Sequence, residues 1–152
     1  MPLYFSYGSN MDLAAMAARC PRSRPLGPAR LMRHRFFVME SGHASVRRDP
    51  SRSVHGLLWD LALRDLPALD AYEEVGRGLF VKRALPVIGP RGPRRALVYV
   101  GASDKPGAVL PGYMEGVIAA ATRHALPATW LRELASWLAS ARRAAKGARR
   151  PE

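Results

Sequence analysis

The stretch Tyr4-Phe5-Ser6-Tyr7-Gly8-Ser9-Asn10-Met11 is the part of the chain around which we expect the rest to fold. Its aromatic half is typical of a buried strand, and it breaks at Gly-Ser-Asn before an alanine-rich segment at residues 12–19. Glycine permits unusual backbone angles, and serine and asparagine are good helix caps. The stretch therefore predicts a strand, a tight loop at Gly8 and a helix that is capped by Ser9 or Asn10.

A junction of this kind points several backbone N–H groups into one small space, where the helix dipole also favours negative charge. Such a loop can hold a carboxylate, or it can stabilise an oxyanion that forms during a reaction. The same residues also fit a simple polar turn with a helix cap. The local sequence leaves both interpretations open.

The chain has 152 residues, which suffice for one domain with a real core, whereas a second domain would be cramped. We expect a single domain at residues 1–145 and a basic, frayed tail at 146–152. No apolar run approaches the roughly 20 residues that cross a bilayer. We also find no secretory signal, so we expect a cytoplasmic protein without a membrane partner.

The formal net charge is +12, and arginine contributes most of it, so a nucleic acid or another polyanion must be considered as a partner. The basic residues are spread along the chain and include no recognised nucleic-acid-binding motif. We therefore expect most of them to be solvated surface side chains. Nucleic-acid binding is kept as the weakest alternative.

Few residues offer metal or cofactor chemistry. Cys20 is the only cysteine, which excludes an internal disulfide and a metal site with several cysteines. The histidines lack the spacing of metal ligands, and they stand at His34, His43, His55 and His124. We therefore expect no metal site.

The remaining chain predicts several strands separated by turns, with few regular alternations of strand and helix. This pattern favours an α+β fold with a mostly antiparallel or mixed sheet that could close into a barrel. We expect a proline-rich loop at 20–28, a turn at 49–51, strands at 29–39, 43–48, 54–61, 79–88 and 96–100, and helices at 64–75, 113–124 and 128–145. Asp65 is the expected N-cap of the first of these helices.

The last predicted helix carries an apolar stripe at spacings of three and four residues. It consists of Trp130, Leu131, Leu134, Trp137 and Leu138. The stripe could pack on the body of the protein, which we favour, or on a second copy. The sequence therefore allows a monomer or a homodimer.

Acidic residues are scarce in this basic chain, and Glu73 and Glu74 adjoin before a glycine-rich segment. Only one of two adjacent side chains can face a given site. A carboxyl near apolar strands can have its pKa raised by desolvation, which suits a group that exchanges protons near neutral pH. The pair also fits a solvated helix end, and the local sequence does not choose between these interpretations.

Four segments resemble, in order, motifs of the γ-glutamylcyclotransferase family. The stretch quoted first resembles the family's Tyr-Gly-Ser-Asn loop, and residues 54–59 resemble its Val-x-Gly-Val-Val-Trp strand. Residues 69–75 resemble its Leu-Asp-x-x-Glu-Gly-Val segment, and residues 111–127 are similar to its Pro-x-Tyr helix, which ends in Leu-Pro. Together these matches extend over nearly the whole chain.

This resemblance implies an α+β fold with a small mixed β-barrel and flanking helices. The implied reaction is intramolecular aminolysis, in which the α-amino group of a small-molecule γ-glutamyl substrate attacks its own γ-carbonyl. The products are 5-oxoproline and a free amine or amino acid, and no metal or cofactor is required. The resemblance implies Glu73 as the catalytic acid/base and a substrate site at Tyr7, Gly8, Ser9, Asn10 and Tyr113.

Two positions depart from the family's pattern. Glu74 occupies the usual glycine position after the catalytic glutamate, and Phe80 stands where members of the glutathione pathway typically carry a tyrosine. Both departures bear on the identity of the substrate more than on the reaction. A catalytically silent member that binds a small amino-acid-like ligand is therefore a second hypothesis.

Overall fold

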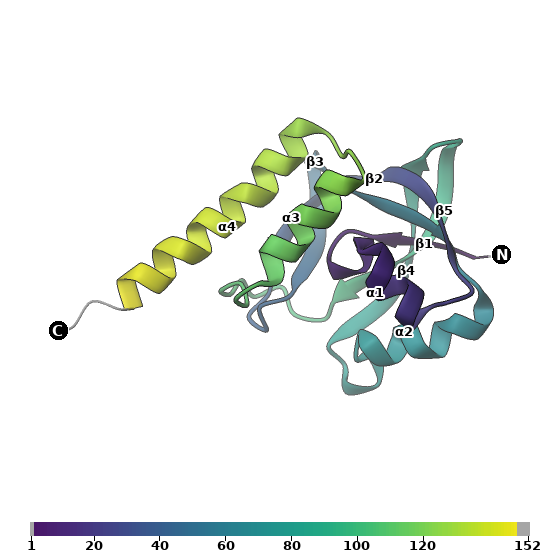
Figure 1. Cartoon of the computed structure of the whole chain (residues 1–152), viewed down its shortest axis with the longest axis horizontal. Coiled ribbons are helices and arrows are strands. Elements are labelled where there is room, and N and C mark those ends of the chain that lie inside the picture. The colour runs from purple at the N-terminus through teal and green to yellow at the C-terminus, as the bar shows by residue number, and fades with distance from the viewer. Residues whose placement is uncertain (1, 149–152) are drawn as a thin grey trace.

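A closed barrel is the centre of the computed structural model, which describes residues 2–148 (Figure 1). Its strands are β1 (Leu3–Ser6), β2 (Arg24–Val38), β3 (Ala44–Asp60), β4 (Phe80–Gly89) and β5 (Gly92–Gly101). Their order around the barrel is β1-β3-β2-β4-β5. Neighbours are antiparallel except β1 and β5, which are parallel where Tyr4 lies opposite Leu97. The predicted small mixed barrel is confirmed.

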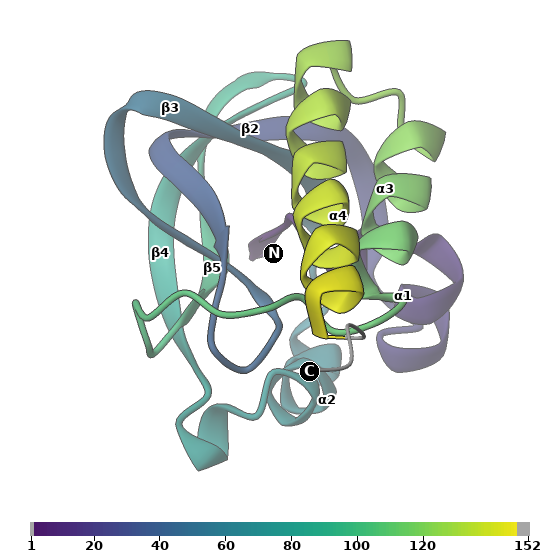
Figure 2. The ribbon, with the colours of Figure 1, turned by 90° about the vertical axis from the view of Figure 1, so that its left-hand side faces the viewer.

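Helices flank the barrel, which makes the fold α+β as predicted. They are α1 (Leu13–Arg19), α2 (Leu66–Tyr72), α3 (Tyr113–Arg123) and α4 (Ala128–Ala148), with short 3₁₀ turns η1 (Ser9–Met11), η2 (Leu63–Asp65) and η3 (Val75–Arg77). Figure 2 shows α3 and α4 side by side against one side of the barrel. Within residues 2–148, no helix is long and apolar enough to cross a membrane.

The loop predicted at 20–28 is wrong in its second half, because β2 begins at Arg24. Pro25 lies opposite Trp59, and the register with β3 then shifts before Gly27. A proline cannot donate a ladder hydrogen bond, but a bulge tolerates it. Proline content alone therefore misplaced the start of the strand.

The turn predicted at 49–51 does not separate two strands, because β3 runs without a break through this region. Asp49 does accept hydrogen bonds from the backbone N–H and the hydroxyl of Ser51, at 3.0 and 2.8 Å. The pairing with β2 shifts here between Met32 and His34, around Arg33, whose φ is +60°. The local turn is thus an irregularity inside one long, curved strand.

Two helix caps differ from the prediction. Asp12, rather than Ser9 or Asn10, caps α1, because its carboxylate accepts from the backbone N–H of Ala15 at 2.9 Å. Asp65 stands at the predicted N-cap position of α2 but makes no capping bond, and α2 ends at Tyr72 and not at residue 75. The buried carboxylate of Asp65 instead accepts from the Arg22 backbone N–H and the Ser23 hydroxyl, at 2.9 and 2.8 Å, and so joins α2 to the chain after α1.

The apolar stripe of α4 packs on the barrel, as we favoured. Trp130 and Leu134 are buried, and the ring of Phe36 in β2 meets Trp130 edge-on at 5.8 Å between centroids. The C-terminal half of α4 projects beyond the barrel (Figure 1). This helix runs to Ala148, past the boundary expected at 145, and the rest of the predicted tail lies outside the described residues.

Candidate active site

A pocket of about 100 Å³ lies where β1 passes into the N-terminal loop. The end of α2, the start of β4 and the end of β5 also contribute to its wall. The structure brings together at this pocket all six residues that the family resemblance implied, namely Tyr7, Gly8, Ser9, Asn10, Glu73 and Tyr113. They come from segments that are more than 100 residues apart in the sequence.

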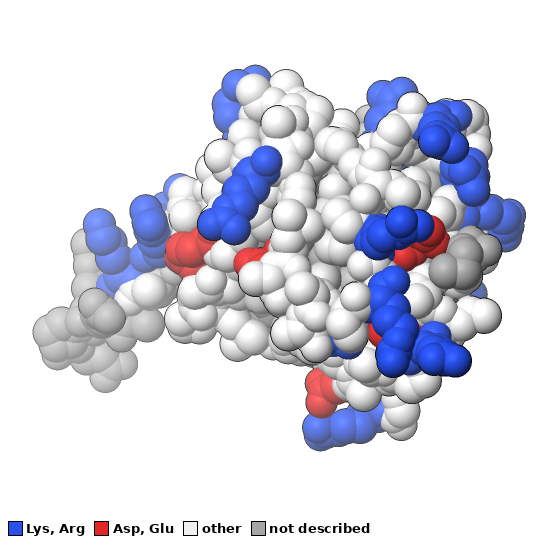
Figure 3. Space-filling view, turned by 45° about the vertical axis from the view of Figure 1, so that its right-hand side comes forward, with Lys and Arg blue, Asp and Glu red and all other residues white. Residues whose placement is uncertain are grey.

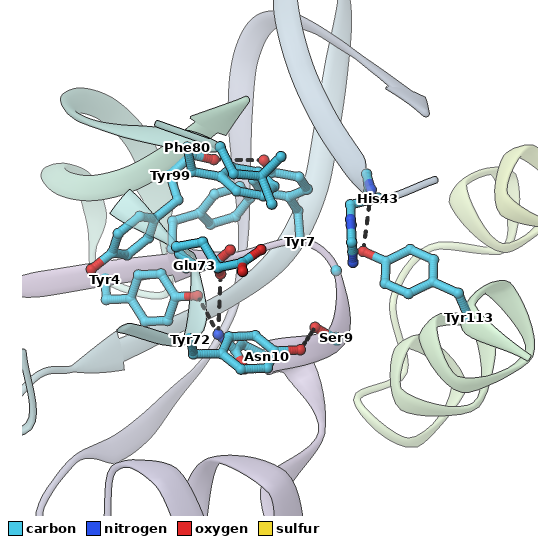
Figure 4. A pocket seen from close by; sticks show the side chains of 15 residues that line it. Tyr4, Tyr7, Ser9, Asn10, His43, Tyr72, Glu73, Phe80, Tyr99 and Tyr113 are labelled. Carbon is cyan, nitrogen blue, oxygen red and sulfur yellow. Dashed lines mark hydrogen bonds between the residues drawn. The ribbon is translucent and has the colours of Figure 1, made fainter. Parts of the chain in front are cut away.

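Glu73 follows the last residue of α2, and its carboxyl points into the space between Tyr7 and Asn10 (Figure 4). The Asn10 side-chain amide donates to Oε1 of Glu73 at 3.4 Å. Burial raises the pKa of Glu73 to about 7, and the positive charge of Arg19 opposes this rise. A carboxyl with this pKa can both accept and release a proton near neutral pH.

Glu74 has different surroundings, although it is the next residue. Its φ is +51°, in the left-handed region, and its carboxylate pairs with Arg77 at 2.9 Å while the side chain is 39% exposed. Both residues line the pocket, but the left-handed residue turns the chain so that the Glu74 carboxylate pairs with Arg77. A glycine adopts this backbone conformation at the lowest cost, which gives the family's glycine a physical reason.

Gly8 permits a close approach of its neighbours, and its φ of −125° lies outside the left-handed region. A Cβ atom at Gly8 would lie 2.8 Å from the hydroxyl oxygen of Tyr113. The loop then closes into η1, where the backbone N–H groups of Met11 and Asp12 donate to Gly8 and Ser9. The N–H groups that precede this turn have no acceptor within it.

Tyr113 opens α3 and closes the pocket on the side of that helix (Figure 4). Its hydroxyl accepts from the backbone N–H of Ala44 at 3.3 Å. The His43 ring meets the Tyr113 ring edge-on, with 5.8 Å between the two ring centroids. Burial raises the pKa of the Tyr113 phenol well above its usual range, so the group stays protonated and can donate to a ligand.

Two further tyrosines fix the wall around Glu73. The Tyr7 hydroxyl donates to the backbone oxygen of Tyr99 at 2.6 Å, and the Tyr99 hydroxyl donates to Asp70 in α2, also at 2.6 Å. Lys82 of β4 pairs with the same carboxylate at 2.9 Å. Asp70 thus ties the helix that precedes Glu73 to two strands of the barrel.

The sequence reasoning missed Tyr4, Tyr72, Tyr99 and Arg19, all of which contribute to the site. Tyr4, Tyr72 and Tyr99 line the pocket. Tyr72 was detectable, because it directly precedes the candidate glutamate. In the structure its hydroxyl meets that of Ser9 at 2.7 Å. Arg19 had no signal in the local sequence.

Phe80, which departs from the family's pattern, also lines the pocket. It is 5% exposed and presents an apolar ring where a tyrosine would offer a hydroxyl. The wall at this position therefore contacts a ligand without a hydrogen bond.

The charges on the surface contrast with this pocket of phenols, an amide and a carboxyl. In Figure 3 the lysine and arginine side chains lie in separate groups, with uncharged surface between them. Among residues 2–148, no three His, Cys, Asp or Glu side chains gather in a way that could hold a metal ion.

The comparisons with known proteins agree with this fold. Residues 53–134 match the model of the AIG2-like family. The chain belongs to the AIG2-like family. No curated protein sequence shows a significant match to this AIG2-like chain.

Solved structures share the fold of this AIG2-like protein. One described as gamma-glutamyl cyclotransferase superposes with a TM-score of 0.81 at 24% identity, covering 88% of this chain and 85% of its own. An uncharacterized protein from Homo sapiens superposes with a TM-score of 0.79 at 24% identity, and the match covers 87% of this chain and 85% of that protein. An AIG2-like protein from Mus musculus gives 0.57 at 16%, with 75% and 82% covered. At these identities the similarity establishes the fold.

Proposed function

We propose that the protein is a γ-glutamyl cyclotransferase, which converts a γ-glutamyl amide into 5-oxoproline and a free amine or amino acid. The observation that carries the proposal is the Glu73 carboxyl, which has a pKa of about 7 and faces the Tyr-Gly-Ser-Asn loop across a small pocket. The similarity in fold to gamma-glutamyl cyclotransferase supports it. The proposal gives the Glu73 carboxyl the role of acid/base and the N-terminal loop the role of binding the substrate.

Glu73 would act first as a base. The substrate's α-amino group is an ammonium at neutral pH and cannot attack a carbonyl until it loses a proton. Ionised Glu73 would accept that proton, and the amine nitrogen would form a bond to the γ-carbonyl carbon. Five-membered ring closure gives a tetrahedral intermediate with negative charge on the former carbonyl oxygen and positive charge on the ring nitrogen.

Glu73 would then act as an acid. The bond between the carbonyl carbon and the amide nitrogen breaks, and the leaving nitrogen takes a proton from Glu73, so the carboxylate is restored. The ring nitrogen gives up its extra proton, which the released amine takes up to leave as an ammonium. One amide bond forms and one breaks, and no water or redox partner enters the balance. A pKa near 7 favours both steps, because the carboxyl binds and releases the proton at a similar cost.

The remaining groups of the pocket would bind the substrate and the developing charge. The backbone N–H groups of Gly8, Ser9 and Asn10 are suited to a carboxylate or an oxyanion, and the Tyr113 hydroxyl can donate to the same region. Enclosure by the aromatic side chains would hold the flexible γ-glutamyl chain in the conformation that cyclises. The apolar ring of Phe80 would contact the substrate without a hydrogen bond.

The first test is 5-oxoproline release from a panel of γ-glutamyl amino acids and γ-glutamyl amines. We expect turnover by the intact protein with at least one class of leaving group, and none by the Glu73→Gln variant. Binding of the best substrate should survive this substitution, because the amide keeps the size of the side chain.

Binding without turnover by the intact protein would contradict the proposal. It would favour the catalytically silent ligand-binding member, for which Glu73→Gln should have little effect on affinity. Turnover that survives in the Glu73→Gln variant would contradict the role given to Glu73 and leave the reaction itself in place.

A further inference from the structure

Arg19 contacts both segments that bring Glu73 and the N-terminal loop together. It is the last residue of α1, and its Nη1 donates to Oδ1 of Asn10 in the loop. Its guanidinium carbon also lies 3.4 Å from the centroid of the Tyr72 ring, at the end of α2. We propose that Arg19 is a positioning residue, which orients the Asn10 amide toward Glu73 and holds the loop against the end of α2.

The orientation of the Asn10 amide follows from its partners. Asn10 is only 2% exposed, so its polar atoms depend on partners within the protein. Because the Arg19 guanidinium only donates, it selects Oδ1, and Nδ2 is left to donate to the Tyr4 hydroxyl at 3.1 Å and to Glu73 at 3.4 Å. A rotated amide would set its oxygen against the Glu73 carboxylate, which would destabilise the ionised form.

The positive charge of Arg19 also acts on the Glu73 carboxyl. Among residues 2–148, no carboxylate lies within 4.0 Å of its guanidinium, whereas five other basic side chains have such a partner. Arg19 is half-buried, so water screens its charge only in part. Its attraction for ionised Glu73 lowers the pKa of that carboxyl against the larger effect of burial.

The contact with Tyr72 completes the link between the segments. The guanidinium face packs on the Tyr72 ring, while the Tyr72 hydroxyl bonds to that of Ser9 at 2.7 Å. The loop and the end of α2 are therefore joined through Arg19 and through Ser9, in addition to the bond from Asn10 to Glu73. A lysine would keep the charge, but it lacks the planar group that stacks on a ring while its edge donates a hydrogen bond.

The role of Arg19 in catalysis rests on the proposed function, whereas its effect on Glu73 does not, and the two can be measured separately. The first measurement is a ¹³C NMR titration of the Glu73 carboxyl, with the resonance assigned through its loss in Glu73→Gln. The proteins are the intact chain, Arg19→Met, Arg19→Lys and Arg132→Met. Arg132 is exposed on α4, away from the pocket, and Arg132→Met removes the same charge.

The titration midpoint of Glu73 should rise in Arg19→Met, rise less in Arg19→Lys and stay in place in Arg132→Met. With an active γ-glutamyl substrate, kcat/KM of Arg19→Met should fall roughly tenfold at pH 6.5 but only about twofold at pH 9, where Glu73 is ionised in either protein. A role confined to folding would lower kcat/KM by the same factor at every pH. Circular dichroism verifies the fold, and Arg19→Lys carries the test if Arg19→Met does not fold.

An unchanged Glu73 midpoint in folded Arg19→Met and Arg19→Lys would overturn the proposal. A shifted midpoint together with no turnover by the intact protein would support the link from Arg19 to Glu73 and contradict the proposed function. The two failures therefore give different results.

Discussion

The inner and outer faces of the turn after α2 carry the same side chain in different surroundings. On the inner face, burial raises the pKa of Glu73 to about 7. On the outer face, Glu74 pairs with Arg77 and is 39% exposed. One left-handed residue separates a carboxyl suited to proton transfer from one that is solvated and paired, so backbone direction, and not residue type, assigns the chemistry here.

The largest expected effect is on turnover, and it separates the two faces directly. Glu73→Gln should lower kcat by about 10³-fold, since it removes the group that accepts and returns the proton. Glu74→Gln has the same chemical change on the outer face and should stay within about threefold of the intact protein. Initial rates of 5-oxoproline release measure both, and equal losses in the two variants would contradict the separation.

The pH dependence should report the inner face alone. Glu73 must be ionised to act as a base, so kcat/KM should be level above its pKa of about 7 and fall about tenfold per pH unit below it. The midpoint of this fall in kcat/KM should be the same for substrates whose amino groups differ in pKa, because the group that titrates is Glu73 of the protein. A midpoint near 4.5, the ordinary value for a glutamate, would contradict the burial of Glu73.

The close packing of the pocket that Glu73 faces can be tested at Gly8. A methyl group there would lie 2.8 Å from the Tyr113 hydroxyl oxygen, so Gly8→Ala should displace the loop and lower kcat/KM roughly 10²-fold. Removing that hydroxyl should relieve the contact. We therefore expect the double variant Gly8→Ala with Tyr113→Phe to be more active than Gly8→Ala alone, and Tyr113→Phe alone is the control. If the losses in kcat/KM of the two single variants simply multiply in the double variant, the contact between residue 8 and the hydroxyl is not the cause.

Stability should change in the direction opposite to activity at Glu73. Its pKa is raised from 4.5 to about 7 in the folded protein, so the folded state holds its proton more tightly and loses stability as pH rises through that window. Glu73→Gln should therefore gain about 2 kcal/mol in free energy of unfolding at pH 8 and almost nothing at pH 4. Urea denaturation at both pH values measures this, and a gain that is equal at pH 4 and pH 8 would count against it.

The smallest effect is expected on the outer face. Glu74→Gly should raise the free energy of unfolding by about 0.5 kcal/mol, because glycine adopts the left-handed backbone without a Cβ penalty and an exposed ion pair contributes little. Glu74→Ala removes the same carboxylate but keeps the Cβ atom. Thermal unfolding should therefore place Glu74→Gly above Glu74→Ala, and the reverse order would show that the pair with Arg77 matters more than the backbone.

Local patterns in the sequence were sufficient for the elements that local interactions stabilise. The strand, loop and helix at residues 3–19, the hairpin of β4 and β5, and the stripe on α4 follow from propensity, turn residues and periodicity. The family resemblance added the set of residues around the pocket. Patterns failed at β3, where the turn at Asp49 sits inside a strand, because pairing with β2 over a long distance outweighs one local turn.

Tertiary structure alone decided the properties of the site that depend on surroundings. Glu73 and Glu74 are chemically identical in the sequence, and only the folded chain buries one and turns the other toward Arg77. Arg19 likewise reaches Asn10 and Tyr72 only once α1 and α2 have packed. Desolvation and charge act through space, so the pKa of about 7 at Glu73 depends on the packing of the barrel. Most of the strands and helices, in contrast, follow from the local sequence, because local interactions stabilise them.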